Sequence, residues 1–430
     1  SGRVTKSLAL LGEASRKLAA SADYSITGGS AMGLISDRLA RLAPSPTVAI
    51  TDMAMNMRRA GRDVIGLGAG EPDFDTPQHI KDAASAAMRD GKTKYTQVDG
   101  IPELKEAICR KFARENNMHC TPDQVSVGAG GKQVLFNALT ASLNPGDEVV
   151  IPVPFWVSFA GIVQLVEAVP VYLQPASDDL KFTADELAGC ITAKTKWLIL
   201  NSPSNPGGVG YTATDLLAIA EVLRAHPHVH VISDDIYEHL TYDDFKFATL
   251  ASVAPDLQGR IVTLNGVSKS YCMTGWRIGY CAAPVELVKA MAKVQSQSTS
   301  SPNSMAQWAA IAALDGPTDF IDDNRRAFAV RRQLVCDALN AMPGITCAQP
   351  DGAFYVYPSI SGLLGKTRPD GQVIATDADF VRYLLEAGEV AVVPGVAFGL
   401  SPYFRISYAA ADTVLAEAMA RIGRAVDSLS

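Results

Sequence analysis

The sequence predicts an α/β protein in which helices cover both faces of a mostly parallel sheet, followed by a smaller α+β domain. Short apolar runs alternate with helical patterns along most of the 430 residues, which is typical of parallel strands joined by helical crossovers. Four runs rich in branched residues are too short for helices, at 148–152, 197–201, 229–233 and 261–265. From about residue 320, one long helical pattern and short apolar segments indicate the second domain.

The remaining elements follow in chain order. An apolar run at 64–68 precedes a Gly/Pro turn, and residues 76–89 are predicted to form a helix with Thr76 as N-cap and Pro77 in its first turn. A second amphipathic helix is expected at 102–116. The other expected elements are a strand at 124–128, a helix at about 132–143, a turn at 144–147, a helix at 320–340 and short strands around Phe354 and Val392.

Three parts of the chain are distinguished. Residues 1–30 are rich in Ser, Ala and basic residues and lack a long apolar stretch, so we expect a leader that is either artificial or disordered, with Met32 as a natural start. A transit peptide is the other interpretation of this segment. Residues 31–75 and 319–430 are expected to form the small domain, and residues 76–318 the large domain.

Composition narrows the classes of function. A net charge of −7 argues against a general nucleic-acid binder and against docking on an acidic membrane surface. No apolar stretch approaches the roughly 20 residues that span a bilayer. The odd number of cysteines, 7, without a C-x-x-C pair favours a reducing, cytoplasmic compartment. His226, His228 and His230 alternate along a chain segment, but no partner completes a metal site, so no metal is expected.

Two glycine-rich turns were compared with nucleotide-binding fingerprints. The turn at 66–70 fails the dinucleotide pattern because Glu71 replaces its last glycine. The turn at 128–133 fails the P-loop pattern because Ser126 and Gln133 stand where a glycine and a hydroxyl are needed. A strand, a glycine turn and a helix N-terminus still suit a phosphate, although a simple tight turn explains this segment equally well.

A third segment carries reactive chemistry. Ser268 and Lys269 follow the run at 261–265, and Arg277 lies eight residues further on. Lys269 stands among small, apolar and aromatic neighbours, and a desolvated lysine loses its proton more readily and can attack an aldehyde. Ser268 and Arg277 could together hold a phosphate.

Further polar residues follow other predicted strands. Asn205 lies in a Pro-rich turn after 197–201, and Asp234 and Tyr237 follow 229–233. Ligands of open parallel sheets bind at the carboxyl ends of the strands, so one site could receive all of these side chains together with Lys269. Each residue alone also has a structural explanation, as a turn former, a helix N-cap or a core aromatic.

These segments closely resemble the fold-type I pyridoxal-phosphate aminotransferases, specifically the bacterial aspartate aminotransferase branch. The resemblance runs from about Leu34 to the C-terminus and rests on S-K-x-x-x-x-x-G-W-R-I-G from Ser268 and G-E-P-D-F-D-T-P from Gly70. One departure is Gly207, where the family usually has Thr in N-P-T-G. The resemblance implies a seven-stranded large-domain sheet, pyridoxal 5′-phosphate as cofactor, and a homodimer with shared active sites.

It also implies a role for each site residue. Lys269 would bond to the cofactor aldehyde and later move the proton, and Asp234 would pair with the pyridine nitrogen. Tyr237 and Asn205 would hydrogen-bond the phenolic oxygen, and Trp156 would stack on the ring. The residues expected at the phosphate are Gly131, Lys132, Ser268, Arg277 and, from the other subunit, Tyr95.

The substrate follows from carboxylate anchors. Arg405 matches the arginine that clamps the α-carboxylate, and the Gly70 N–H would touch the same group. Lys132 matches the lysine that binds the distal carboxylate in this branch, with Ser45 and Thr47 as helpers. Trp156 and Asn205 would also contact substrate. The implied reaction moves an amino group between L-aspartate or glutamate and 2-oxo acids such as 2-oxoglutarate or oxaloacetate, with prephenate as an additional acceptor that yields arogenate.

Two alternatives stay open. An aminotransferase for aromatic or alanine-type substrates, or a lyase on the same fold, would use a partly apolar pocket lined by Phe354 and Trp156. A non-catalytic binding protein of the same fold would be marked by the loss of Lys269 or Arg405, and both are present.

Overall fold

The computed structural model describes residues 34–40, 42 and 46–430, with side chains described from residue 50 onward in the helix that begins at Pro46. The predicted leader at 1–30 lies outside the described residues. None of the described helices is both long enough and apolar enough to cross a membrane.

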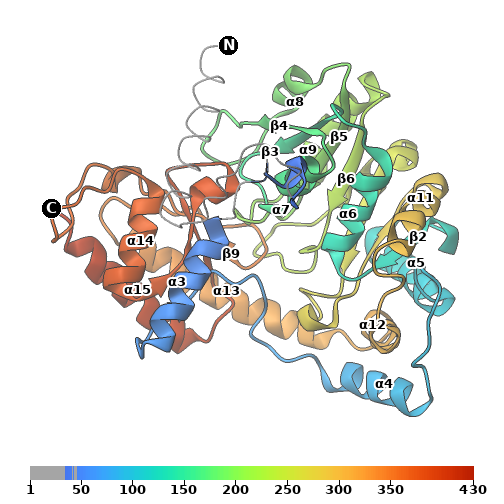
Figure 1. Ribbon diagram of the computed structural model, residues 1–430, viewed down its shortest axis with the longest axis horizontal. Helices are drawn as coiled ribbons and strands as arrows, with labels where there is room; N and C mark the ends of the chain where they lie inside the picture. The colour runs from blue at the N-terminus through green and yellow to red at the C-terminus, as the bar shows by residue number, and fades with distance from the viewer. Residues whose placement is uncertain (1–33, 41, 43–45) are drawn as a thin grey trace.

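A seven-stranded sheet forms the centre of the larger part of the molecule (Figure 1). Its spatial order is β2-β8-β7-β6-β5-β3-β4, and β8 runs in the direction opposite to the other six strands. The strands are β2 (Val125–Gly128), β3 (Glu148–Pro152), β4 (Val169–Leu173), β5 (Thr195–Asn201), β6 (His230–Asp234), β7 (Ile261–Gly266) and β8 (Gly279–Ala282). The predicted mostly parallel, seven-stranded sheet is therefore confirmed.

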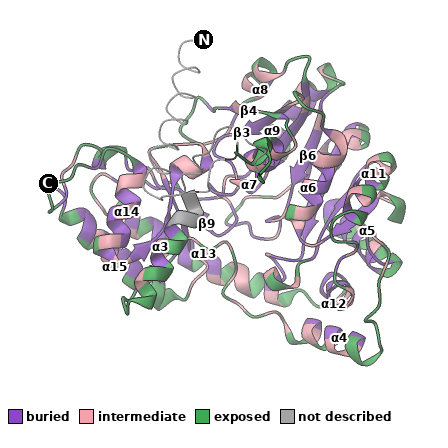
Figure 2. Cartoon of the chain, viewed as in Figure 1, coloured by how far each residue is buried: buried purple, intermediate pink, exposed green. Residues whose placement is uncertain are grey.

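Helices cover both faces of this sheet because its strands are apolar on both sides. In β5, Trp197 and Ile199 face one core and Leu198 and Leu200 face the other. The first core is closed by α6 (Gly131–Ser142), α7 (Ser158–Leu165) and α11 (Val285–Ser296). The second is closed by α4 (Gln78–Arg89), α5 (Pro102–Asn116), α8 (Ala184–Cys190), α9 (Ala213–Ala225), α10 (Leu250–Val253) and α12 (Ser304–Asp315). Figure 2 shows the buried strands between helices whose outer faces are exposed.

A separate core lies in the C-terminal part. It contains α13 (Asp319–Asn340), α14 (Asp377–Gly388), α15 (Asp412–Asp427) and an antiparallel sheet of order β11-β12-β9, formed by Val393–Pro394, Phe404–Ser407 and Tyr355–Val356. The chain before residue 70 joins this core. Ile50 and Ala54 of α3 (Pro46–Arg59) pack into it, and β1 (Ile65–Gly66) pairs with β10 (Val390–Ala391). Figure 1 shows α3 against the C-terminal part of the chain. A short α2 (Asp37–Ala40) precedes α3. The proposed domain boundaries at 75/76 and 318/319 stay a prediction.

Several element ends differ from the expectation. The helix predicted from Thr76 begins at Gln78, because the Thr76 hydroxyl donates to the Cys272 carbonyl and accepts from Trp276 Nε1 instead of capping the helix. The strand predicted to end at residue 233 includes Asp234, whose register partner in β7 is Leu264. The apolar run at 64–68 forms only a two-residue strand, since β10 is equally short.

Candidate active site

A cavity of about 590 Å³ opens at the carboxyl ends of β5, β6 and β7 and is closed on one side by β12. It contains all of the predicted cofactor and substrate residues except Tyr95, Phe354 and the helpers Ser45 and Thr47, which lie outside the described side chains. The predicted residues that line it are Gly70, Gly131, Lys132, Trp156, Asn205, Asp234, Tyr237, Ser268, Lys269, Arg277 and Arg405. Tyr95 is 94% exposed in the single chain, so its expected role at the other subunit's site stays a prediction.

Lys269 points into the cavity without a carboxylate bound to it. Its Nζ donates to the Gly70 carbonyl at 2.5 Å and lies 5.9 Å from the centre of the Tyr237 ring. Burial, with Arg405 and Arg277 nearby, lowers the pKa of Lys269 to about 8. A substantial fraction of this amine is therefore neutral and nucleophilic near physiological pH.

Asp234 is a buried carboxylate with little support from the protein. Among the described residues its Oδ1 accepts only a long bond, 3.4 Å, from the Ile236 N–H, and burial raises the pKa of Asp234 to about 7. Such a group favours a ligand that brings a protonated nitrogen into contact with it.

Arg405 is a buried cation with neutral partners. Its Nη1 donates to Asn205 Oδ1 at 2.8 Å and its Nη2 to the Gly68 carbonyl at 2.6 Å. Its Nε has no hydrogen-bond partner among the described residues, and burial lowers the pKa of the guanidinium. The rings of Tyr355 and Phe398 flank it at 4.6 and 4.9 Å. A buried cation without an anionic partner suits an incoming carboxylate.

The turn that carries Asn205 is fixed to the neighbouring strand. The Asn205 N–H donates to Asn201 Oδ1 at 2.8 Å, and Asn201 Nδ2 donates to the Asp234 carbonyl at 2.9 Å. At Gly207, where the resembled family has Thr, an added Cβ would lie at least 3.3 Å from its neighbours. The turn is thus held by contacts that do not involve residue 207.

Tyr355, which the sequence did not single out, also lines the cavity, next to Tyr237. The hydroxyl of Tyr355 lies 3.0 Å from that of Tyr237, and burial raises the pKa of both phenols. Tyr355 lines the cavity, whereas Phe354, expected there, does not and is fully buried. Successive residues of an extended chain face opposite sides, so if Phe354 points into the core its neighbour Tyr355 is expected to face the cavity.

Backbone and side chains form a cradle for an anion at the start of α6. Gly130 has φ +88° as N-cap of this helix, and Ser268 and Arg277 line the cavity beside it. A Cβ on Gly130 would lie 2.3 Å from Arg277 Nη2, so only glycine lets the guanidinium approach. The N–H groups and the positive end of the dipole at the N-terminus of α6 favour negative charge, which fits a phosphate.

Lys132 is the second residue of the same helix and lines the same cavity. Its Nζ is 4.9 Å from the centre of the Trp156 ring, and burial, with Arg277, lowers its pKa. Among the ion pairs of the described residues none involves Lys132, so it can bind a ligand carboxylate. The expected helpers Ser45 and Thr47 lie outside the described residues, Thr47 in its side chain only.

These features define a class of site. The cradle suits a phosphate, Lys269 suits an aldehyde, Asp234 suits a protonated ring nitrogen and Arg405 suits a carboxylate. All four requirements are those of a pyridoxal-phosphate site that accepts an amino acid, and the residues present fit that cofactor.

Comparison with known proteins agrees with this class. Residues 62–422 match the family of class I and II aminotransferases, and the chain belongs to that family. It is 59% identical over 392 residues to the aspartate/prephenate aminotransferase of Cereibacter sphaeroides, covering 91% of this chain and 98% of the relative. Enzymes of this family generally depend on pyridoxal phosphate and act on amino acids and 2-oxo acids.

Solved structures share the fold. The aspartate aminotransferase of Rhizobium meliloti has a TM-score of 0.91 at 51% identity, covering 93% of this chain and 100% of that one. The aspartate aminotransferase of Thermus thermophilus with maleate has a TM-score of 0.84 at 40% identity, covering 92% and 100%. The fold-type I class expected from the sequence is confirmed.

Asp234→Asn should stabilise the protein without cofactor, because it removes a buried charge. The pKa of Asp234 is raised on folding from 3.8 to about 7, so the cost of its charge is absent below pH 3.8 and complete above pH 7. The gain should therefore grow across this interval and reach at most roughly 4 kcal/mol. Urea unfolding at several pH values measures it. A gain independent of pH would contradict the assignment.

Gly130→Ala should weaken pyridoxal-phosphate binding by about tenfold or more, because its Cβ displaces Arg277. Gly146→Ala is the matched control: φ is +86° there, so the backbone strain is similar, but an added Cβ meets nothing within 4 Å. Fluorescence titration of the cofactor compares the two variants. Equal losses of affinity would mean that strain, and not the cradle, is responsible.

Proposed function

We propose that this protein is a pyridoxal-phosphate-dependent aminotransferase that moves an amino group between L-aspartate or glutamate and 2-oxo acids, with prephenate as a further acceptor. One observation carries the proposal. A single cavity combines a lysine of lowered pKa, a buried carboxylate of raised pKa and a buried arginine whose polar partners are neutral.

Bound pyridoxal phosphate supplies an electron-withdrawing ring that stabilises negative charge at the substrate Cα. Asp234 would keep a proton on the ring nitrogen, and Tyr237 and Asn205 would donate hydrogen bonds toward the phenolic oxygen. Trp156 stacks on the ring. Gly131, Ser268 and Arg277 would hold the phosphate, assisted by the backbone of Lys132 at the start of α6 and by Tyr95 of the other subunit.

Lys269 has two tasks. Its neutral amine would hold the cofactor, and when free the same amine would accept the proton from the substrate Cα and give it up again. The pKa of about 8 suits both directions of this transfer near neutral pH.

Carboxylates determine the choice of substrate. Arg405 binds the α-carboxylate, next to Gly70, and Lys132 binds the distal one. Three relations support this choice: the relative from Cereibacter sphaeroides is an aspartate/prephenate aminotransferase, that from Rhizobium meliloti an aspartate aminotransferase, and the Thermus thermophilus enzyme is solved with maleate, a dicarboxylate. Lysine is a flexible point charge, and beside Trp156 it can serve both an aliphatic acid and the ring of prephenate.

The proposal includes a cytoplasmic homodimer. Tyr95, 94% exposed, is available to a partner subunit, and the unpaired cysteines suit a reducing compartment.

An absorbance spectrum before and after L-aspartate tests the function directly. We expect a visible band of the bound cofactor that bleaches with aspartate and returns with 2-oxoglutarate or prephenate. Lys269→Ala should still bind the cofactor but lose turnover. A wild-type protein that shows no such band after addition of pyridoxal phosphate would overturn the proposal, and a band that ignores aspartate would favour the aromatic or lyase alternative.

Lys132→Ala should lower kcat/KM for aspartate and glutamate about tenfold or more, and that for alanine far less, because only dicarboxylates use the ammonium group. Lys289→Ala, an exposed lysine on α11, is the control. Steady-state rates with the three donors give the comparison. Equal losses for all donors would place Lys132 at the phosphate or in the fold instead.

A further inference from the structure

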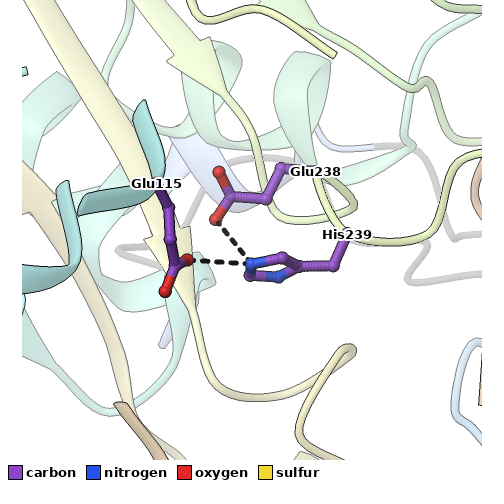
Figure 3. A group of neighbouring side chains, drawn as sticks. All are labelled: Glu115, Glu238 and His239. Carbon is purple, nitrogen blue, oxygen red and sulfur yellow. Dashed lines mark hydrogen bonds and ion pairs between the residues drawn. The ribbon is translucent and has the colours of Figure 1, made fainter. Parts of the chain in front are cut away.

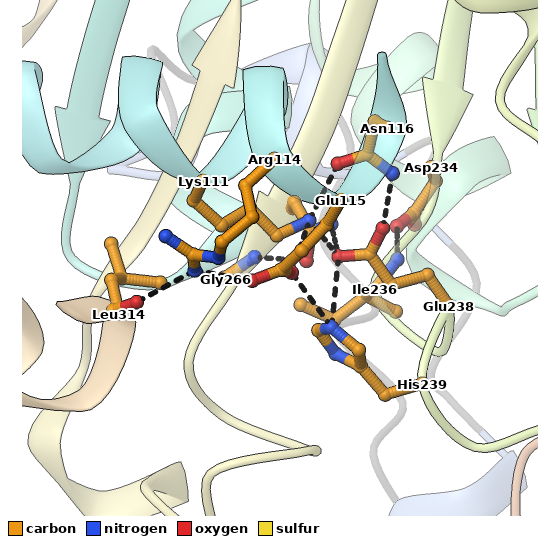
Figure 4. A network of polar contacts seen from close by, with 11 residues as sticks. Lys111, Arg114, Glu115, Asn116, Asp234, Ile236, Glu238, His239, Gly266 and Leu314 are labelled. Carbon is orange, nitrogen blue, oxygen red and sulfur yellow. Dashed lines mark hydrogen bonds and ion pairs between the residues drawn. The ribbon is translucent and has the colours of Figure 1, made fainter. Parts of the chain in front are cut away.

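A buried polar network lies behind the cavity, where α5 meets the loop after β6 (Figure 4). Its centre is the carboxylate of Glu238, whose side chain is 3% exposed. Glu238 Oε1 accepts from Lys111 Nζ and, at 2.7 Å, from Asn265 Nδ2, while Oε2 accepts from Asn116 Nδ2 at 2.6 Å. One carboxylate thus joins helix α5, the loop after β6 and strand β7.

Figure 3 shows Glu115, Glu238 and His239 close enough to suggest metal ligands. Their charge is already balanced inside the protein. Lys111 Nζ bonds to Glu238, donates to Asn116 Oδ1 at 2.7 Å and lies 3.4 Å from Glu115 Oε2. His239 Nε2 lies 2.9 Å from the same Glu115 oxygen. The ammonium group occupies the position of a cation, so this cluster requires no metal ion.

The network is adjacent in sequence to two loops of the candidate site, the one with Asp234 and Tyr237 and the one with Ser268 and Lys269. Glu238 directly follows Tyr237 and lies four residues after Asp234. Asn265 is the next-to-last residue of β7, four residues before Lys269, and its Oδ1 accepts from the Gly266 N–H at 2.7 Å. Glu238 and Asn265 do not line the cavity.

We propose that the Glu238–Asn265 hydrogen bond is a positioning device, which fixes the Asp234–Tyr237 loop relative to the Ser268–Lys269 loop. Lys111 and Asn116 hold Glu238 from α5 and keep its carboxylate in place. This inference rests on the proposed function, because it concerns the contacts of these two loops with the cofactor.

A buried ion pair is a costly way to gain stability alone. Removing Lys111 and Glu238 from water is expensive, and apolar residues of similar volume are often as stable. Despite burial, Lys111 and His239 hold the pKa of Glu238 below its usual value, so it stays charged and its hydrogen bonds stay strong. Such bonds fix geometry more narrowly than apolar contacts, and reacting groups need placement to within about 0.5 Å.

Asn265→Ala tests the device without leaving a buried charge unpaired. It should weaken pyridoxal-phosphate affinity on the order of tenfold and lower kcat by a similar factor, with KM for aspartate within about twofold, since Arg405 lies on another element. The pH midpoint of the bound cofactor's absorbance should also shift, because Asp234 and Tyr237 set it. Asn265→Ser, which is shorter but polar, replaces Asn265→Ala if that variant does not fold.

Asn137→Ala is the matched control. Asn137 is an equally buried asparagine whose Nδ2 donates to one side chain, Gln295, at 2.7 Å, within α6 and α11. It should lose comparable thermal stability but keep cofactor affinity, absorbance midpoint and kcat.

The outcomes separate the two hypotheses. If the wild-type protein turns over but Asn265→Ala and Asn137→Ala have the same cofactor affinity, pH midpoint of the absorbance and kcat, the positioning role alone is overturned. The network is then purely structural. A wild-type protein that binds no cofactor or ignores aspartate would overturn the proposed function and this inference together. A shift confined to Asn265→Ala supports the inference.

Discussion

The parallel pairing of β6 with β7 fixes where Asp234 stands relative to Lys269. Asp234 is opposite Leu264, and the next N–H along the chain, that of Asp235, donates to the Leu264 carbonyl at 2.9 Å. Asn201, at the end of β5, holds the Asp234 carbonyl from the other side. The carboxylate therefore belongs to the rigid sheet edge and not to a loop, and the rest of the site is arranged around it.

This arrangement has a cost in stability. Asp234, Lys269 and Arg405 are removed from water without forming ion pairs with one another, and the pKa of each is displaced toward its neutral form. Charges left without partners in the protein are available to a ligand that brings the complementary groups. The opposite solution appears a few residues away, where Glu238 and Lys111 neutralise each other and are used for rigidity.

The C-terminal core completes the site from outside the large sheet. Arg405 is contributed by β12 and Tyr355 by β9, and both strands pack with the N-terminal α3 and β1. Arg405 then crosses to Asn205 on the large sheet. Arg405, proposed to bind substrate, and Asn205, proposed to bind the cofactor, are thus linked directly, and the cavity lies between the large sheet and the C-terminal core.

The sequence by itself determined the alternation of strands and helices, the failed nucleotide fingerprints and the reactive set around Lys269, because these depend on local patterns and short motifs. Only the tertiary structure decided the partners of these residues. Thr76 bonds to Cys272 and not to a helix end, Tyr355 and not Phe354 faces the cavity, and Lys111 meets Glu238 from 127 residues away. The physical reason is that burial and pairing are properties of the folded surroundings. A lysine on an amphipathic helix looks the same in sequence whether it faces solvent or a buried carboxylate.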